Sequence, residues 1–177
     1  FASEEATASL IEQIAIFHQV GFRVVLVHGG GPQSTELAKQ LGQTPRFVDG
    51  RRVTDAAALD VAMMVLNGQI NTRIVASCRA FGVPGIGISG ADSGLIQAVK
   101  RPPVKSSEGE TVDNGFVGDN RKVDVSVLET QLDNGLVPIV SSLSADDDGT
   151  LLNINADTVA AAIACELGAE KLILATG

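Results

Sequence analysis

Three consecutive glycines stand where an apolar segment meets a predicted helix, in the stretch VVLVHGGGPQ at residues 24–33. Glycine has no Cβ, so the backbone N–H groups of such a run can turn toward a ligand without obstruction. The N-terminus of the following helix adds free N–H groups and a positive partial charge. We therefore predict that Gly29, Gly30 and Gly31 form a loop that binds an anion such as a phosphoryl group. A tight turn needed only for packing is the alternative.

The spacing of these glycines excludes two common nucleotide-binding motifs. The run lacks the Lys-Ser/Thr ending of a P-loop. It also lacks the glycine spacing of the dinucleotide-binding fingerprint. Any positive charge that helps to hold an anion must therefore come from elsewhere in the chain.

Arg51 and Arg52 are the best local source of that charge. A guanidinium is a planar fork that grips a carboxylate through two parallel hydrogen bonds. Adjacent side chains in an extended segment point in opposite directions, so we expect only one of the two arginines to face a site. Two solvated surface arginines would produce the same pattern.

The stretch NINAD at residues 153–157 supplies a third set of polar groups. Asn155 is typical of a helix cap, and Asp157 falls in the first turn of the helix that follows. Asn153 is predicted on the same side as Asn155, where its amide could bind a polar ligand. An aspartate at this place can orient a lysine without reacting itself. Capping and interaction with the helix dipole alone are the alternative.

Two other polar features are interpreted as structural. His28 closes an apolar strand, and we interpret it as a hydrogen-bonded core residue in preference to a general base. The run Asp146 to Asp148 lacks further ligands at loop spacing, so it indicates a solvated turn and not a metal site. No residue of the chain is therefore assigned to a metal.

The elements that must position these residues alternate between strand and helix. Residues 24–27 carry no polar alternation, which indicates a parallel strand buried on both faces. A hairpin or an extended loop is expected around Asp49-Gly50, and a longer surface hairpin at 95–120. Thr54 is expected to cap a long helix that is interrupted at Gly68. The remaining strands are expected at 86–88, 137–140 and 172–175. The helices are expected at 3–21, 32–41, 54–81, 124–134 and 156–167. This order predicts an α/β fold with an open, mainly parallel sheet sandwiched between helices.

Composition and net charge limit the possible binding partners of the protein and its cellular compartment. The 177 residues are 45% hydrophobic and carry a net charge of −8, which disfavours nucleic acid and acidic membranes as partners. Cys78 and Cys165 lack metal-type spacing and are interpreted as reduced core thiols of a cytoplasmic protein. No apolar run is long enough to span a membrane. Both ends enter secondary structure abruptly, so the chain is expected to be part of a larger α/β protein.

In this order, the features resemble the acetylglutamate kinases of the amino-acid kinase superfamily. The resemblance is carried by seven stretches that span nearly the whole chain: VVLVHGGGP, FVDGRRVTD, GISGADSGLI, GFVGD, VPIVSS, NINADTVAAAIA and AEKLILATG. VHGGGP alone would indicate only the superfamily.

The resemblance implies an enzyme of arginine biosynthesis, usually a homodimer, that phosphorylates the side-chain carboxylate of N-acetyl-L-glutamate with ATP and Mg²⁺. It implies that Gly30 and Gly31 contact the substrate and the transferred phosphoryl group through their N–H groups. It further implies that Arg52 holds a substrate carboxylate and that Asn153 binds near the substrate backbone and acetamido group. Asp157 would orient the catalytic lysines, so the resemblance gives Gly30 and Asp157 catalytic roles.

The chain departs from the family pattern at both ends. The Lys-x-Gly-Gly first strand and the ATP-binding half with its second lysine are not found in residues 1–177. The segment is therefore expected to be the substrate-binding and dimerisation portion of the domain and to be inactive alone. Two other functions stay open: a non-catalytic, arginine-sensing domain of an acetylglutamate synthase, and a sister kinase for carrier-bound aminoadipate.

Overall fold

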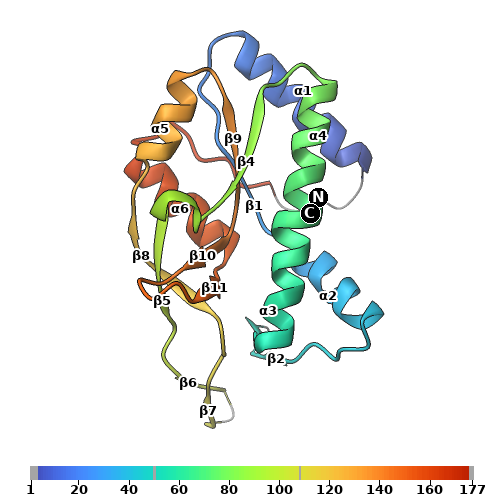
Figure 1. Cartoon of the computed structure of the whole chain (residues 1–177), viewed down its shortest axis with the longest axis vertical. Helices are drawn as coiled ribbons and strands as arrows, with labels where there is room; N and C mark the ends of the chain where they lie inside the picture. The colour runs from blue at the N-terminus through green and yellow to red at the C-terminus, as the bar shows by residue number, and fades with distance from the viewer. Residues whose placement is uncertain (1–3, 50, 108, 176–177) are drawn as a thin grey trace.

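A three-stranded parallel sheet lies at the centre of the computed structural model, which describes residues 4–49, 51–107 and 109–175 (Figure 1). The strand order is β1 (Leu26–His28), β9 (Val137–Ser141), β4 (Gly85–Ser89). The register places His28 opposite Ser141, and Ser141 opposite Ser89. Each strand thus ends in a polar residue at the same edge, the edge at which open α/β sheets bind ligands.

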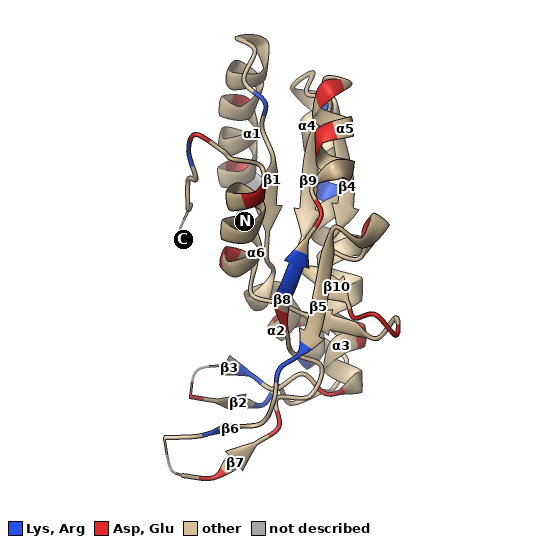
Figure 2. Ribbon diagram, turned by 90° about the vertical axis from the view of Figure 1, so that its left-hand side faces the viewer, with Lys and Arg blue, Asp and Glu red and all other residues tan. Residues whose placement is uncertain are grey.

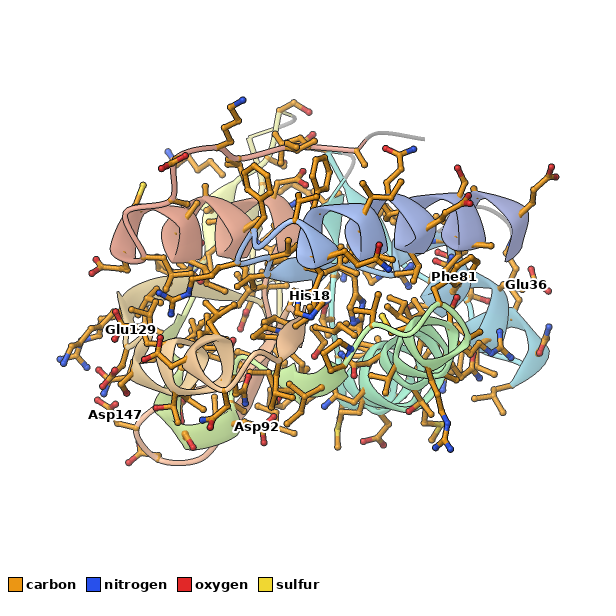
Figure 3. All side chains as sticks on the ribbon, turned by 90° about the horizontal axis from the view of Figure 1, so that it is seen from above. His18, Glu36, Phe81, Asp92, Glu129 and Asp147 are labelled. Atoms are coloured by element: carbon orange, nitrogen blue, oxygen red, sulfur yellow. The ribbon has the colours of Figure 1, made fainter. Side chains whose placement is uncertain are left out.

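Apolar side chains fill both faces of this sheet. Ile139 points into a core shared with α1 (Glu4–Gln19), and its neighbour Val140 points into a second core with Leu128 and Val159. The other helices on these faces are α2 (Gly31–Gln40), α4 (Thr72–Ala80), α5 (Ser126–Asp133) and α6 (Ala156–Glu166). Figures 1 and 3 show α5 and α6 on one side of the strands and α4 on the other. The predicted sheet sandwiched between helices is confirmed.

The first strand is shorter and less buried than its sequence predicts. It begins at Leu26, and residues 24–27 are only half-buried, whereas burial on both faces was expected. The reason is its place in the sheet, because among the described strands β1 pairs only with β9. Its parallel direction is as predicted.

A second sheet continues from the carboxyl end of the first. Its order is β11-β10-β5-β8, with β5 and β8 antiparallel, which confirms the hairpin expected at 95–120. The short pair β6–β7 extends this hairpin outward. The elements of this part are η2 (Asp92–Gly94), β5 (Ile96–Lys100), β6 (Val104–Lys105), β7 (Thr111–Val112), β8 (Gly118–Val123), β10 (Leu143–Ala145) and β11 (Leu151–Asn153).

The long helix differs from the prediction in its cap and in its middle. Asp55 is the N-cap, since its side chain accepts a 2.8 Å hydrogen bond from the Ala58 N–H. Thr54 is instead fully buried, and its backbone pairs with the chain around Gly115. Gly68 does not interrupt the helix, which widens there into a π-helical turn. The three consecutive segments are α3 (Ala56–Met63), η1 (Met64–Asn71) and α4.

The arginine hairpin forms as expected. The strands β2 (Phe47–Val48) and β3 (Arg51–Arg52) are antiparallel, and Asp49 in the turn has a left-handed φ of 48°. Gly50 lies outside the described residues. Ser107 of the neighbouring hairpin donates to the Asp49 carboxylate through its N–H at 2.9 Å and its Oγ at 2.5 Å. Figure 2 shows the two hairpins projecting side by side at the same end of the molecule.

The strand predicted at 172–175 does not form. These residues are irregular, and the side chains of Leu172, Ile173 and Leu174 are exposed. The physical reason is the absence of a pairing partner among the described strands, because a lone extended segment leaves its backbone groups to water. The described helices include none with the length and apolar character needed to cross a bilayer.

Candidate active site

The glycine run leaves β1 and enters α2 at the carboxyl edge of the parallel sheet. Gly30 is the N-cap, and its carbonyl oxygen accepts a 2.9 Å hydrogen bond from the Ser34 N–H. Pro32 occupies the first turn, where its missing N–H removes no intrahelical bond. The N–H groups of this first turn have no intrahelical acceptor and carry the positive end of the helix dipole. The glycine run therefore ends at a helix N-terminus, as expected, and its binding of an anion stays a prediction.

Two of the three glycines lie where a larger side chain would not fit. A Cβ on Gly30 would lie 2.5 Å from Ile70 Cδ1 and 3.0 Å from Leu66 Cδ2, so this residue is pressed against η1. A Cβ on Gly29 would lie 3.2 Å from the Ala156 Cβ. A Cβ on Gly31 would meet nothing within 4 Å. Packing thus explains two of the glycines, and only Gly31 borders open space.

The close approach of Gly29 to Ala156 brings a second helix N-terminus to the same place. The Asn155 side chain caps α6 by accepting a 2.9 Å hydrogen bond from the Thr158 N–H, as predicted. Asp157 is exposed in the first turn of α6. The N-termini of α2 and α6 therefore converge at the end of β1, and both favour a negatively charged ligand there.

Arg52 reaches this edge from the hairpin. Its Nη2 donates to the Gly31 carbonyl oxygen at 3.1 Å and to Thr35 Oγ1, and Thr35 Oγ1 donates to the same carbonyl at 3.0 Å. The Arg52 Cζ also lies 5.0 Å from the centre of the Phe47 ring. Partial burial lowers the pKa of Arg52 from its ordinary value. One arginine of the pair thus faces the glycine loop, as predicted, while the Arg51 side chain lies outside the described part of the chain.

The structure joins the other two predicted residues to the site less directly. Asn153 ends β11, where its backbone N–H donates to the Phe116 carbonyl at 2.8 Å. Its side chain makes no hydrogen bond to another described residue. Asp157 forms no ion pair with a described lysine or arginine. Roles for both residues therefore stay predictions.

His28 is a buried, hydrogen-bonded residue, as interpreted from the sequence. Its Nδ1 lies 3.1 Å from the Gly29 carbonyl oxygen, and its Nε2 lies 3.1 Å from Asn71 Nδ2. Burial lowers the pKa of His28, which favours a neutral ring. Asn71 also donates to the Ile139 carbonyl at 2.9 Å, and Asn67 accepts from Ser141 Oγ at 2.5 Å.

Sequence reasoning missed four residues around the site. Thr35 and Phe47 hold Arg52, and Asn67 and Asn71 join η1 to the sheet. The two asparagines had a detectable signal, because they stand four residues apart in an otherwise largely apolar part of the long helix. Such a spacing places both side chains on one face.

The acidic turn is confirmed as a turn. Asp146 Oδ1 accepts hydrogen bonds from the N–H groups of Asp148 at 3.1 Å and Thr150 at 2.8 Å. Across the described residues, His, Cys, Asp and Glu form no group of three or more that could hold a metal ion.

The fold and the glycine loop correspond to a known class of phosphotransferases. The sequence profile of the amino acid kinase family matches residues 1–177, and the chain belongs to this family. Among its relatives, the acetylglutamate kinase of Symbiobacterium thermophilum is 46% identical over 99% of this chain and 60% of its own length. The acetylglutamate kinase of Methanopyrus kandleri is 49% identical over 86% of this chain and 61% of its own length. The chain thus spans about 60% of the length of these curated relatives.

A solved structure of a different enzyme is also similar. The N-acetylglutamate synthase of Neisseria gonorrhoeae, in complex with coenzyme A and N-acetyl-glutamate, matches with a TM-score of 0.77 and 29% identity. The match covers 95% of this chain and 37% of the synthase. The same synthase in complex with coenzyme A and L-arginine matches with a TM-score of 0.73 and 25% identity.

Proposed function

We propose that this chain is the substrate-binding part of an acetylglutamate kinase, which transfers a phosphoryl group from ATP to the side-chain carboxylate of N-acetyl-L-glutamate. One observation carries the proposal: the Arg52 guanidinium lies against the Gly31 carbonyl, beside the N-terminus of α2. A fixed cation next to free N–H groups suits a substrate with two carboxylates. The names of the relatives supply the particular substrate.

The proposed chemistry needs no general base, because a carboxylate is already a nucleophile at neutral pH. Catalysis then consists of bringing two anions into line and stabilising the oxygens of the transferred group. Arg52 holds the carboxylate that does not react, and Asn153 binds the substrate backbone and acetamido group. The N–H groups of Gly30 and Gly31 stabilise the phosphoryl oxygens. Asp157 orients lysines supplied from outside residues 1–177.

The co-substrate is proposed to bind mainly outside this chain. ATP and Mg²⁺ need cationic and acidic groups, and the described residues offer no acidic cluster for a metal. The chain alone is expected to bind acetylglutamate and to show no turnover.

We further propose a homodimer in the cytoplasm. Among the described strands β4 pairs only with β9, so its outer edge is available to a second copy of the chain. Met63 and Met64 are exposed on the adjoining long helix, at 37% and 52%. Cys78 and Cys165 are both free thiols, which suits a reducing compartment. Cys78 is buried, but the expected core position is wrong for Cys165, which is exposed. The net charge of −8 argues against nucleic acid as a partner.

A second candidate function is an arginine-sensing domain that performs no phosphoryl transfer. The similarity to the gonococcal synthase, whose structures contain N-acetyl-glutamate or L-arginine, is the observation that favours it. An arginine ligand would present a guanidinium where the kinase substrate presents a carboxylate. The cationic Arg52 beside the loop favours the kinase, because like charges repel.

Calorimetric titration separates the two candidates. N-acetyl-L-glutamate, L-arginine and L-glutamate are titrated into the full-length protein and its Arg52→Ala and Arg23→Ala variants. Arg23→Ala is a matched control, because it removes the same charge at a different place. Arg23 lies before the amino end of β1, where its Nη2 is 2.7 Å from Asp133 Oδ1. The kinase predicts acetylglutamate binding that Arg52→Ala abolishes and Arg23→Ala preserves, together with ATP-dependent formation of an acyl phosphate. Arginine binding without acetylglutamate binding would refute the kinase and support the sensor.

A further inference from the structure

A chain of hydrogen bonds that begins in η1 holds the glycine loop on its buried side. The Asn71 side chain is buried, and its Nδ2 lies 2.9 Å from the Ile139 carbonyl oxygen. A carbonyl can only accept, so the atom facing it must be the amide nitrogen with its two hydrogens. The Oδ1 end lies over Gly87, where a Cβ would come within 1.9 Å of it. The orientation of the Asn71 amide is therefore fixed by its surroundings.

This orientation determines the tautomer of His28. The Asn71 Nδ2 lies 3.1 Å from His28 Nε2, and it is a donor, so Nε2 must present its lone pair. In a neutral ring the proton then resides on Nδ1. The Nδ1 lies 3.1 Å from the Gly29 carbonyl oxygen, which accepts that proton in a hydrogen bond. Both ring nitrogens are thus matched to their neighbours.

The hydrogen bond to Gly29 also fixes the direction of the next N–H group. The carbonyl of Gly29 and the N–H of Gly30 belong to one planar trans peptide, in which the two groups point in opposite directions. Because His28 holds the carbonyl oxygen on the buried side, the Gly30 N–H points away from the core. No described residue accepts a backbone hydrogen bond from this N–H.

We propose that His28 is a positioning residue, which holds the Gly29–Gly30 peptide so that the Gly30 N–H faces the transferred phosphoryl group, and that Asn71 sets the tautomer it needs. The role in the reaction rests on the proposed kinase function, whereas the hydrogen-bond geometry does not. A donor that is already oriented needs no reorganisation in the transition state, which is where such donors contribute most.

Nuclear magnetic resonance tests the geometry without any variant. The chain contains two histidines, His28 and the half-exposed His18 of α1, so the imidazole ¹⁵N signals are simple to assign (Figure 3). We expect His28 to be the neutral Nδ1–H tautomer at pH 7, with a slowly exchanging proton. The Nε2–H tautomer, or a mixture of both, would overturn the proposal whatever the protein catalyses.

A pair of variants tests the consequence for catalysis in the full-length enzyme. In His28→Asn the amide nitrogen replaces Nδ1 and can still donate to Gly29, whereas in His28→Gln the amide replaces Nε2 and can only serve Asn71. We expect His28→Gln to lower kcat by about 10- to 100-fold, up to the loss measured for one oxyanion donor, with little change in the acetylglutamate KM. His28→Asn is expected to restore most of kcat.

The outcomes are distinguishable. A folded His28→Gln variant with the wild-type kcat would refute the positioning role, as would equal losses of kcat in both variants. Urea unfolding identifies a variant that fails to fold. In that case the tautomer of the wild-type His28 ring decides whether the proposed geometry is right. A wild-type enzyme that binds acetylglutamate but forms no acyl phosphate would refute the kinase function and leave the His28 geometry to be judged by the ¹⁵N signals alone.

Discussion

Replacing Gly30 or Gly31 by alanine separates packing from ligand approach within one loop. In Gly30→Ala the new methyl group would lie 2.5 Å from Ile70 Cδ1 and 3.0 Å from Leu66 Cδ2, against an ordinary carbon contact of about 3.5–4.0 Å. Both side chains are buried, at 7% and 3% exposure. Overpacking of this kind costs about 1–3 kcal/mol. The reduced entropy of the unfolded chain returns about 0.4–1 kcal/mol. We expect a net loss of about 1–2 kcal/mol.

Gly31→Ala should behave in the opposite way. Its methyl group meets nothing within 4 Å, and the residue lies in the first turn of α2, so the free energy of unfolding should be unchanged or slightly higher. The same methyl group enters the space in which the substrate is proposed to lie. Losing one hydrogen bond from an N–H to a charged group costs about 1.5–3 kcal/mol. Acetylglutamate affinity should therefore fall about tenfold or more.

Two measurements on each variant decide the matter. Urea unfolding gives the free energy of unfolding, and calorimetry on the folded protein gives the acetylglutamate dissociation constant. The reasoning is wrong if Gly30→Ala is as stable as the wild type. It is equally wrong if Gly31→Ala keeps both its stability and its affinity, because the open side of the loop would then not be the ligand side.

Three further predictions concern stability and reactivity. Asp55→Ala removes the N-cap of α3 and should lower the free energy of unfolding by about 1 kcal/mol, whereas Asp55→Asn should change it little; equal losses in urea would contradict the capping role. Burial lowers the pKa of His28 below its ordinary 6.5, so the unfolded chain binds a proton first as the pH falls. The contribution of neutral His28 to the free energy of unfolding should be fully present above pH 6.5 and decline as the pH falls below that value. The difference in this free energy between the wild type and His28→Gln should therefore become smaller at lower pH. Alkylation read by mass spectrometry should modify exposed Cys165 in the native protein and spare Cys78, whose thiol is buried and whose pKa burial raises; rapid modification of Cys78 would contradict its burial.

The sequence predicts the parts of this fold that depend on local chemistry. The glycine run after β1, the hairpin around Asp49 and the Asn155 cap all form where expected, because turn and cap preferences act over a few residues. The errors arise where a distant partner decides. Thr54 is a good capping residue, but its backbone is taken by the chain near Gly115, so Asp55 caps the helix. Leu172 to Ala175 has strand composition and lacks a strand to pair with among those described.

The candidate site shows the same division. Residue type and spacing indicated that one arginine of the pair would face the glycines, and Arg52 does so. The side chains that hold it, Thr35 and Phe47, carry no signal of their own, because their role depends on how the hairpin packs onto α2. The link between His28 and Asn71 joins residues 43 positions apart and could be seen only in the folded chain.

The π-helical turn η1 brings together two contacts that an α-helix of the same sequence would separate. Each residue of an α-helix turns the chain by about 100°, so Leu66 and Asn71, five residues apart, would point about 140° away from each other. The i→i+5 hydrogen bonds of η1 widen the turn and bring residues of this spacing toward one face. Leu66 can then pack against Gly30 while Asn71 contacts His28. The extra residue of the π-helical turn is thus what couples the glycine loop to the sheet through a single helix.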